Sequence, residues 1–210
     1  MLSKEEKTES LIRKLGTEPP SRENIWGNLL FLIPLFSIGF ILFCLSFYPI
    51  TAPLIHIPTL FPDFLWIAIV GAISFWVLSR LRFPEESFSK TSKLPILFGL
   101  VWILYSSGLY GWDLISGHEF SHHIGRCSAI IFLSSILLCG SGFSLLKKGN
   151  PGNPILSSAV LSVFSLALAN FCLKFVCGDQ SSYHIFFSHG LPSLFLFFIG
   201  FFVLKNILKW

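Results

Sequence analysis

Charged side chains are scarce in this chain of 210 residues: Asp, Glu, Lys and Arg make up 12% of it, whereas apolar residues make up 53%. An average soluble domain carries about twice that share of charge. So few charges cannot cover the surface of a soluble domain, and such high hydrophobicity excludes a disordered chain. The composition therefore predicts an integral membrane protein whose apolar segments lie in lipid.

Motifs of common soluble enzymes are also missing. The sequence has no phosphate-binding loop, no dinucleotide fingerprint and no Ser-His-Asp pattern. His118-Glu119-Phe120-Ser121-His122 does match H-E-x-x-H, the helical motif in which two His bind zinc and the Glu acts as base. Because Gly117 and Gly125 flank the match, it reads as a loop between spans. We therefore predict a protein that is not an enzyme and has no catalytic residues, with a zinc metalloprotease using this motif as the alternative.

Acidic residues inside the apolar segments are scarce as well. Asp63, Asp113 and Asp179 all fall in or beside predicted outer loops. A proton or ion pathway through a membrane normally needs buried charge. A small-molecule or ion transporter is therefore a second, weaker alternative.

Six apolar runs are each long enough to cross a bilayer as a helix. They cover about 26–48, 64–81, 94–112, 127–146, 155–176 and 183–204. We expect an all-α polytopic membrane protein with a six-helix transmembrane bundle over 26–210. The polar segment 1–25 precedes the bundle as a separate cytosolic piece.

The distribution of Lys and Arg predicts the orientation of the bundle. With both termini in the cytoplasm, 13 of the 15 basic residues lie on the cytoplasmic side of the predicted spans. Cytoplasmic loops carry such an excess of Lys and Arg. Arg126 and Lys174 fall toward the outside, where we expect Lys174 to extend its amine to the interface. The predicted location is a bacterial inner membrane.

Thiols and imidazoles gather at the predicted outer face. All six His lie at or near it, and Cys127 and Cys177 begin and end neighbouring antiparallel spans there. This pair is the candidate for redox or metal sensing, because two such thiols can form a disulfide, bind a metal ion or simply pack together. Four nearby residues are candidate metal ligands: His118, His122, His123 and Asp179. We expect no required cofactor, with a bound metal ion possible at this face.

The N-terminal segment has the pattern of a short amphipathic helix. Ser3 and Glu6 fit a capping box, and Leu11, Ile12 and Leu15 share one helical face. A helix this short is marginal in water and needs a partner or the bilayer surface. We predict that these three side chains bind a partner, together with Lys147 and Lys148 on a cytosolic turn.

The order of several short motifs resembles one family. They are Glu9 to Leu15, then Arg126-Cys127, the basic turn from Leu146 to Pro154, Val176-Cys177-Gly178-Asp179 and the terminal Leu208-Lys209-Trp210. The chain resembles the negative-regulator-of-sigma-F family of six-span bacterial inner-membrane anti-sigma factors. The resemblance covers the whole chain.

This resemblance implies a function and a partner. Such proteins hold an extracytoplasmic-function sigma factor at the membrane and release it under metal or oxidant stress. The family's paired cysteines correspond to Cys127 and Cys177, and its cytosolic basic turn to Lys147–Pro154. The implied partners are the sigma factor and the lipid bilayer, with no direct contact to nucleic acid.

Overall fold

The computed structural model describes residues 57–81, 90–117, 126–147, 151–175 and 177–208. These residues all belong to one compact unit, Phe40–Trp210. They form helices and turns and contain no strand, which confirms the all-α class for this part of the chain. The N-terminal segment 1–25 and the first predicted span, 26–48, lie outside the described residues. Six spans and cytoplasmic termini therefore remain predictions.

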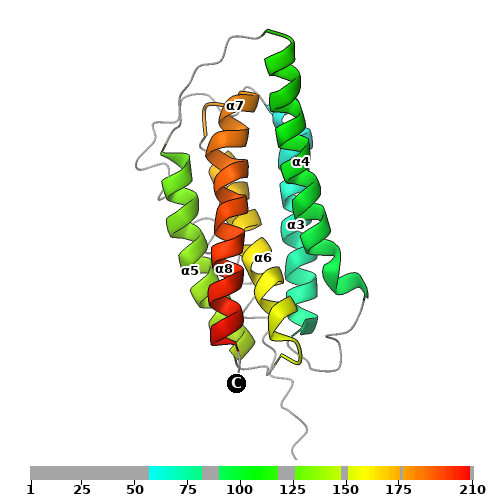
Figure 1. Ribbon diagram of the computed structural model, residues 1–210, viewed down its shortest axis with the longest axis vertical. Coiled ribbons are helices and arrows are strands. Elements are labelled where there is room, and N and C mark those ends of the chain that lie inside the picture. The colour runs from blue at the N-terminus through cyan, green and yellow to red at the C-terminus, as the bar shows by residue number, and fades with distance from the viewer. Residues whose placement is uncertain (1–56, 82–89, 118–125, 148–150, 176, 209–210) are drawn as a thin grey trace, which may run out of the picture. The chain divides into compact units, whose positions relative to one another are not determined.

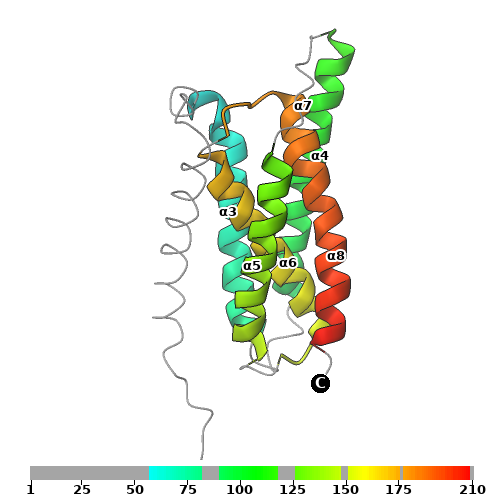
Figure 2. The ribbon, with the colours of Figure 1, turned by 90° about the vertical axis from the view of Figure 1, so that its left-hand side faces the viewer.

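The described elements form an antiparallel helical bundle (Figure 1, Figure 2). In chain order they are α3 (Ile57–Leu81), the 3-10 turn η3 (Lys90–Lys93), α4 (Leu94–Ile115), α5 (Cys127–Lys147), α6 (Pro154–Lys174), α7 (Ser182–His184), the π-helical turn η4 (Ile185–Gly190) and α8 (Leu191–Ile207). The last three elements run on without a break. Five stretches are long and apolar enough to cross a membrane, and they coincide with the second to sixth predicted spans.

Local sequence explains where these helices begin. The Asn153 side chain accepts a hydrogen bond of 3.0 Å from the Leu156 N–H, and Pro154 follows as the first residue of α6. Both residues are typical of a helix start. The Asn side chain accepts from a backbone N–H that has no partner within the helix, and Pro has no N–H that would be left unpaired there. Helix α3 starts at Ile57, earlier than the predicted span, and includes Pro62. The membrane-crossing stretch of α3 covers Pro62–Leu81.

Helix α6 lies at the centre of the bundle. Within its membrane-crossing stretch 83% of the residues are buried, against at most 33% in the other four stretches. Small residues let neighbouring backbones approach closely in membrane bundles. The buried hydroxyls of Ser162 and Ser165 donate to carbonyls four residues earlier in the same helix. A Ser-rich helix can therefore be buried here without leaving these polar groups unpaired.

Two glycines mark the closest approaches to α6. A Cβ atom at Gly142 of α5 would overlap the Leu161 side chain, and one at Gly200 of α8 would lie 2.9 Å from the Ser162 Oγ. Hydrogen is the one side chain that fits such contacts without a shift of the neighbour. These glycines allow α5 and α8 to pack directly against the central helix.

The two ends of the bundle differ in chemistry. The start of α5, the end of α6 and the α7 turn lie together at one end (Figure 1, Figure 2). The end of α3, η3 and the end of α8 lie at the opposite end, and they carry Arg80, Lys90, Lys93 and Lys205. The first of these ends is called the thiol end below, and the second the basic end.

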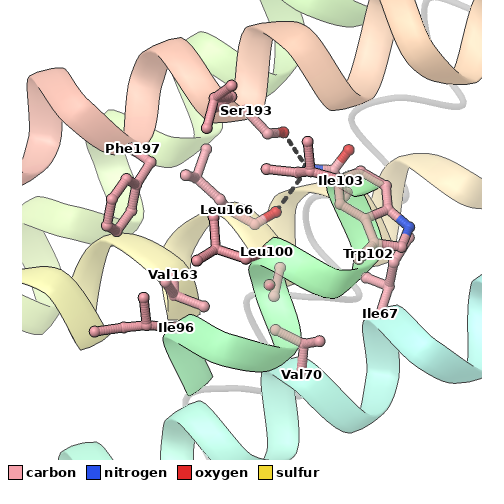
Figure 3. Close-up of a pocket in the computed structure, with 14 residues that line it drawn as sticks. Ile67, Val70, Ile96, Leu100, Trp102, Ile103, Val163, Leu166, Ser193 and Phe197 are labelled. Atoms are coloured by element: carbon pink, nitrogen blue, oxygen red, sulfur yellow. Dashed lines mark hydrogen bonds between the residues drawn. The ribbon is translucent and has the colours of Figure 1, made fainter. Parts of the chain in front are cut away.

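A small apolar pocket of about 60 Å³ lies between α3, α4, α6 and α8 (Figure 3). Its wall includes Val70, Ile96, Val163 and Phe197, and Asn170 lies at its polar edge. Packing between these four helices is therefore incomplete in the middle of the bundle.

Candidate functional site

Four side chains that can bind metal or react with oxidants meet at the thiol end. They are Cys127, Cys177, His184 and His189, called the thiol–imidazole cluster from here on. One ligand atom from each lies within 4.8 Å of those of the others. Their exposed fractions are 4%, 4%, 3% and 0%. Three separate parts of the chain supply them: the start of α5, the loop after α6, and the α7–η4 segment.

The two thiols are in direct contact. The Sγ atoms of Cys127 and Cys177 lie 3.6 Å apart, and both residues are free cysteines. This proximity agrees with the expectation from two antiparallel neighbouring spans. The hydrogen bond with Cys127 lowers the pKa of the Cys177 thiol below its ordinary value of 9.0, burial opposes this, and the hydrogen bond with His184 lowers the pKa further. Cys177 is therefore the sulfur of the pair that favours the thiolate, the reactive and metal-binding form.

A π-helical turn brings the two histidines together. His184 and His189 are five residues apart, which in an α-helix would turn their side chains about 140° away from each other. In η4 the Leu191 N–H donates to the Phe186 carbonyl five residues earlier. Pro192 has no N–H with which to continue the α-helical pattern, which favours the wider turn. The two imidazole rings consequently lie 5.4 Å apart between centroids.

Hydrogen bonds fix the orientation of the His189 ring, whose Nδ1 is directed at Asn170. Asn170 donates its amide hydrogens to the Leu166 carbonyl at 2.8 Å and to the Ser193 Oγ at 2.9 Å (Figure 3). Its Oδ1 then accepts from His189 Nδ1 at 3.0 Å. A carbonyl oxygen needs a donor, so the proton is assigned to Nδ1 and the lone pair to Nε2. This buried Nε2 has no hydrogen-bond partner among the described residues.

His184 is held from the opposite side of its ring. Its Nε2 lies 3.3 Å from the Cys177 Sγ, while its Nδ1 lies 3.3 Å from the Ser188 Oγ and 3.6 Å from Asp179 Oδ2. Asp179 was predicted as a metal ligand. Its carboxylate lies behind His184, and its Oδ1 accepts a hydrogen bond from the Ser181 N–H. This arrangement suits a group that orients His184 better than one that binds metal itself.

A buried ion pair lies beside the cluster and corrects the expectation for Lys174. Lys174 is 4% exposed and forms an ion pair with Asp63 of α3, so its amine does not reach the interface. Trp102 of α4 donates to the same carboxylate. Lys174 also donates to the Gln180 side chain at 3.0 Å, and Gln180 donates to the Cys177 carbonyl at 2.8 Å. These bonds connect the Cys177 loop to α3, α4 and α6.

Most of the other predicted site residues lie outside the part of the chain that the structure describes. His118, His122 and His123 lie outside the described residues, and the whole H-E-x-x-H match lies there with them. Leu11, Ile12, Leu15 and Lys148 also lie outside them. Lys147 is the last residue of α5, at the basic end.

Sequence reasoning placed His184 and His189 at the outer face but did not join them to the thiols. Their five-residue spacing is not a helical repeat, so pattern analysis treats them as pointing apart. The available signal was Pro192, which follows His189 by three residues inside an apolar span. A proline at that place makes a local π turn more probable than a regular helix.

These observations define a class. Five apolar helices of membrane-crossing length, with a buried dithiol and two imidazoles at one end, describe a polytopic membrane protein with a group of side chains that could hold a metal ion. A family model described as "Negative regulator of sigma F" matches residues 15–210. The chain belongs to this family, as the resemblance implied. Searches of curated proteins and of solved structures found no match.

The match has two consequences. The family's description implies a sigma factor as partner and a regulatory role, which favours regulation over catalysis. The matched range begins at residue 15, so Leu11 and Ile12 of the predicted docking helix lie outside it.

Proposed function

We propose that this protein is an anti-sigma factor of the bacterial inner membrane. It holds an extracytoplasmic-function sigma factor at the cytoplasmic face and releases it under metal or oxidative stress sensed at the outer face. The family match over residues 15–210 carries the anti-sigma role. The contact between Cys127 and Cys177 supports the sensing role. Packing alone does not require two thiols and two imidazoles to meet, because apolar side chains would fill the same space.

The basic end of the bundle is the side assigned to the sigma factor. Arg80, Lys90, Lys93 and Lys205 gather there, and cytoplasmic ends of membrane proteins carry this excess of positive charge. The thiol end then faces outward, toward the oxidising side of the membrane. Signal and partner are thus at opposite ends of one bundle.

Oxidation changes the cluster by a balanced reaction. Hydrogen peroxide removes two electrons and both thiol protons from Cys127 and Cys177, a disulfide forms between the two sulfurs, and the hydrogen peroxide becomes two molecules of water. The sulfurs lie 3.6 Å apart in the reduced pair, so they must move closer to bond. The start of α5 and the loop after α6 move with them.

Polar contacts give this movement a route into the bundle. The Cys177 carbonyl is bonded to Gln180, Gln180 to Lys174, and Lys174 to the Asp63 carboxylate of α3. A shift of the Cys177 loop therefore acts on a buried ion pair that joins α6 to α3. The small pocket between α3, α4, α6 and α8 is a gap in the packing of these same helices.

The energy required is modest. A hundredfold weaker grip on the sigma factor corresponds to about 2.7 kcal/mol of differential affinity. One disulfide typically contributes about 2 to 4 kcal/mol. A single disulfide at the thiol end thus has an energy of the same order as the differential affinity that release requires.

The docking surface comprises the N-terminal segment and the cytosolic turn. Leu11, Ile12 and Leu15 present one apolar face that fits a groove on a partner, and Lys147 and Lys148 add positive charge beside it. Helix-in-groove binding of this kind relies on a few apolar side chains at helical spacing.

The test uses tagged full-length protein in detergent as bait for the sigma factors of the same organism. We expect one sigma factor to co-elute and to be released by peroxide. Cys127→Ser and Cys177→Ser should still retain it but fail to release it, because no disulfide can form. Cys139→Ser, which removes a different thiol of α5, should behave like the unaltered protein.

The same bait tests the docking surface. Leu11→Asp should abolish co-elution, whereas Ser10→Asp adds the same single charge on the opposite helical face and should leave it intact. Absence of any sigma factor from the unaltered bait would refute the anti-sigma role. Release that persists in the Ser variants would refute the sensing role of the thiols.

A further inference from the structure

The thiol–imidazole cluster has the composition of a closed metal site. We infer that it binds one divalent cation of the zinc class, held by two thiolates and two imidazole nitrogens. This inference deepens the proposed function, on which it rests for the link to the sigma factor. Its imidazole ligands are His184 and His189, whereas the histidines expected from the sequence, His118, His122 and His123, lie outside the described residues.

Distances within the cluster suit a tetrahedral ion. With bonds of about 2.3 Å to sulfur and about 2.0 Å to nitrogen, the ligand atoms of a tetrahedral zinc site lie about 3.3 to 3.8 Å apart. The two Sγ atoms are 3.6 Å apart, and the Cys177 Sγ is 3.3 Å from His184 Nε2. All four ligand atoms lie within 4.8 Å of one another. Small side-chain rotations therefore suffice to enclose an ion.

The supporting hydrogen bonds point the correct nitrogen of each ring at the centre. Metal-binding His usually donates its other ring N–H to a carboxylate or carbonyl. His189 Nδ1 donates to Asn170, and His184 Nδ1 faces Ser188 and Asp179. His189 thus keeps the lone pair on Nε2, and His184 offers a lone pair to an ion at Nε2 once its proton lies on Nδ1, facing Ser188 and Asp179. The His189 Nε2, fully buried and unpartnered within the described residues, is otherwise an unexplained cost.

Charge and coordination identify the class of ion. Two thiolates and a divalent cation form a neutral centre, which suits a site at the end of an apolar bundle. Two sulfur and two nitrogen ligands in a tetrahedron select zinc-like ions over magnesium or calcium, which prefer oxygen. Four protein ligands leave no open position, so the site binds metal without catalysing hydrolysis.

The surroundings provide an entry route. Gly178 of the loop after α6 is exposed, and the Asp179 side chain is 33% exposed next to His184. Among the described residues, this carboxylate is a partly exposed group next to the cluster through which an ion can approach. Once bound, it ties the start of α5 to the α6–α7 loop and to η4.

The test uses the full-length protein in detergent, reduced, stripped of metal with a chelator and titrated with Co²⁺. We expect the visible absorption bands of tetrahedral cobalt with thiolate charge-transfer absorption, saturating at one equivalent and removed by Zn²⁺. His184→Ala and His189→Gln should each weaken Co²⁺ binding more than about a hundredfold, because loss of second-shell support alone costs about 10- to 100-fold. Asp179→Asn, which keeps all four ligands, should weaken it about tenfold.

Matched variants separate this set from the one expected from the sequence. Cys139→Ser and the triple variant His118→Gln, His122→Gln, His123→Gln should bind Co²⁺ as the unaltered protein does. Binding lost in the triple variant and kept in His184→Ala would overturn the inference. So would an octahedral cobalt spectrum without thiolate charge transfer.

Sigma-factor co-elution is measured on the same samples. A protein that retains the sigma factor but shows no Co²⁺ site overturns this inference and leaves the proposed function standing. A protein that binds Co²⁺ as described but retains no sigma factor supports the inference and refutes the proposed function. Asp179→Asn also reports on folding. The variant binds Co²⁺ more weakly, but a correctly folded site must give the same cobalt spectrum as the unaltered protein at saturation.

Discussion

The Lys174–Asp63 ion pair is the most consequential contact at the scale of single residues. Both groups are buried, at 4% and 7% exposed, and they belong to different helices. Charges removed from water are tolerated when they are paired and hydrogen-bonded. Trp102 and Gln180 supply these further bonds. The pair therefore fixes the end of α6 against α3 directly beside Cys177.

Asp63→Asn is expected to destabilise the bundle by about 3 to 5 kcal/mol, because it leaves the Lys174 ammonium buried without a counter-ion. The amide still accepts from Trp102, so the effect isolates the charge. Thermal unfolding in one detergent measures it. Adding Lys174→Met should recover most of the loss, and a double variant no more stable than Asp63→Asn would contradict this account.

At the scale of elements, the packing of α6 against its neighbours determines where the cluster forms. Cys127 begins α5 and Cys177 follows α6, so the two thiols meet only if α5 and α6 are closely apposed. Buried Ile131 and Leu173 fill the space beneath the sulfurs. Gly142 allows the same close approach toward the other end of α5.

Gly142→Leu is expected to destabilise the bundle by about 1 to 3 kcal/mol, since the new side chain must displace Leu161. Gly140→Leu is the matched control on the same helix, because no described atom lies within 4 Å of a Cβ there. Unfolding midpoints of the two variants in one detergent make the comparison. Equal midpoints would show that this helix crossing is looser than described.

At the scale of the whole molecule, two chemically different ends are separated by the length of the apolar helices. Basic side chains lie at one end and the thiol–imidazole cluster at the other. The end of α8 and the α7 turn, which belong to these two ends, lie at opposite ends of the bundle in Figure 2. A signal from outside the cell and a soluble partner inside it can then act on the same bundle. The orientation of the chain in the bilayer is therefore decisive.

Impermeant maleimide on intact cells tests that orientation. In a chain with all native Cys replaced by Ser, Gly178→Cys should be labelled from outside, since residue 178 is exposed at the thiol end. Lys90→Cys, exposed at the basic end, and Ser10→Cys should react only after the cells are opened. Labelling of residue 90 in intact cells would reverse the proposed topology and remove the basis for sigma-factor binding.

The amino-acid sequence by itself determined the membrane class, the second to sixth spans and the placement of Cys127 and Cys177 at the same face. Hydrophobic length is a local property, and a tight turn forces neighbouring spans to be antiparallel. Tertiary structure decided which groups join the thiols. His184 and His189 share a face because η4 replaces one α-helical turn, and Lys174 finds Asp63 more than a hundred residues away. Such pairings depend on how helices pack, and no local pattern encodes that.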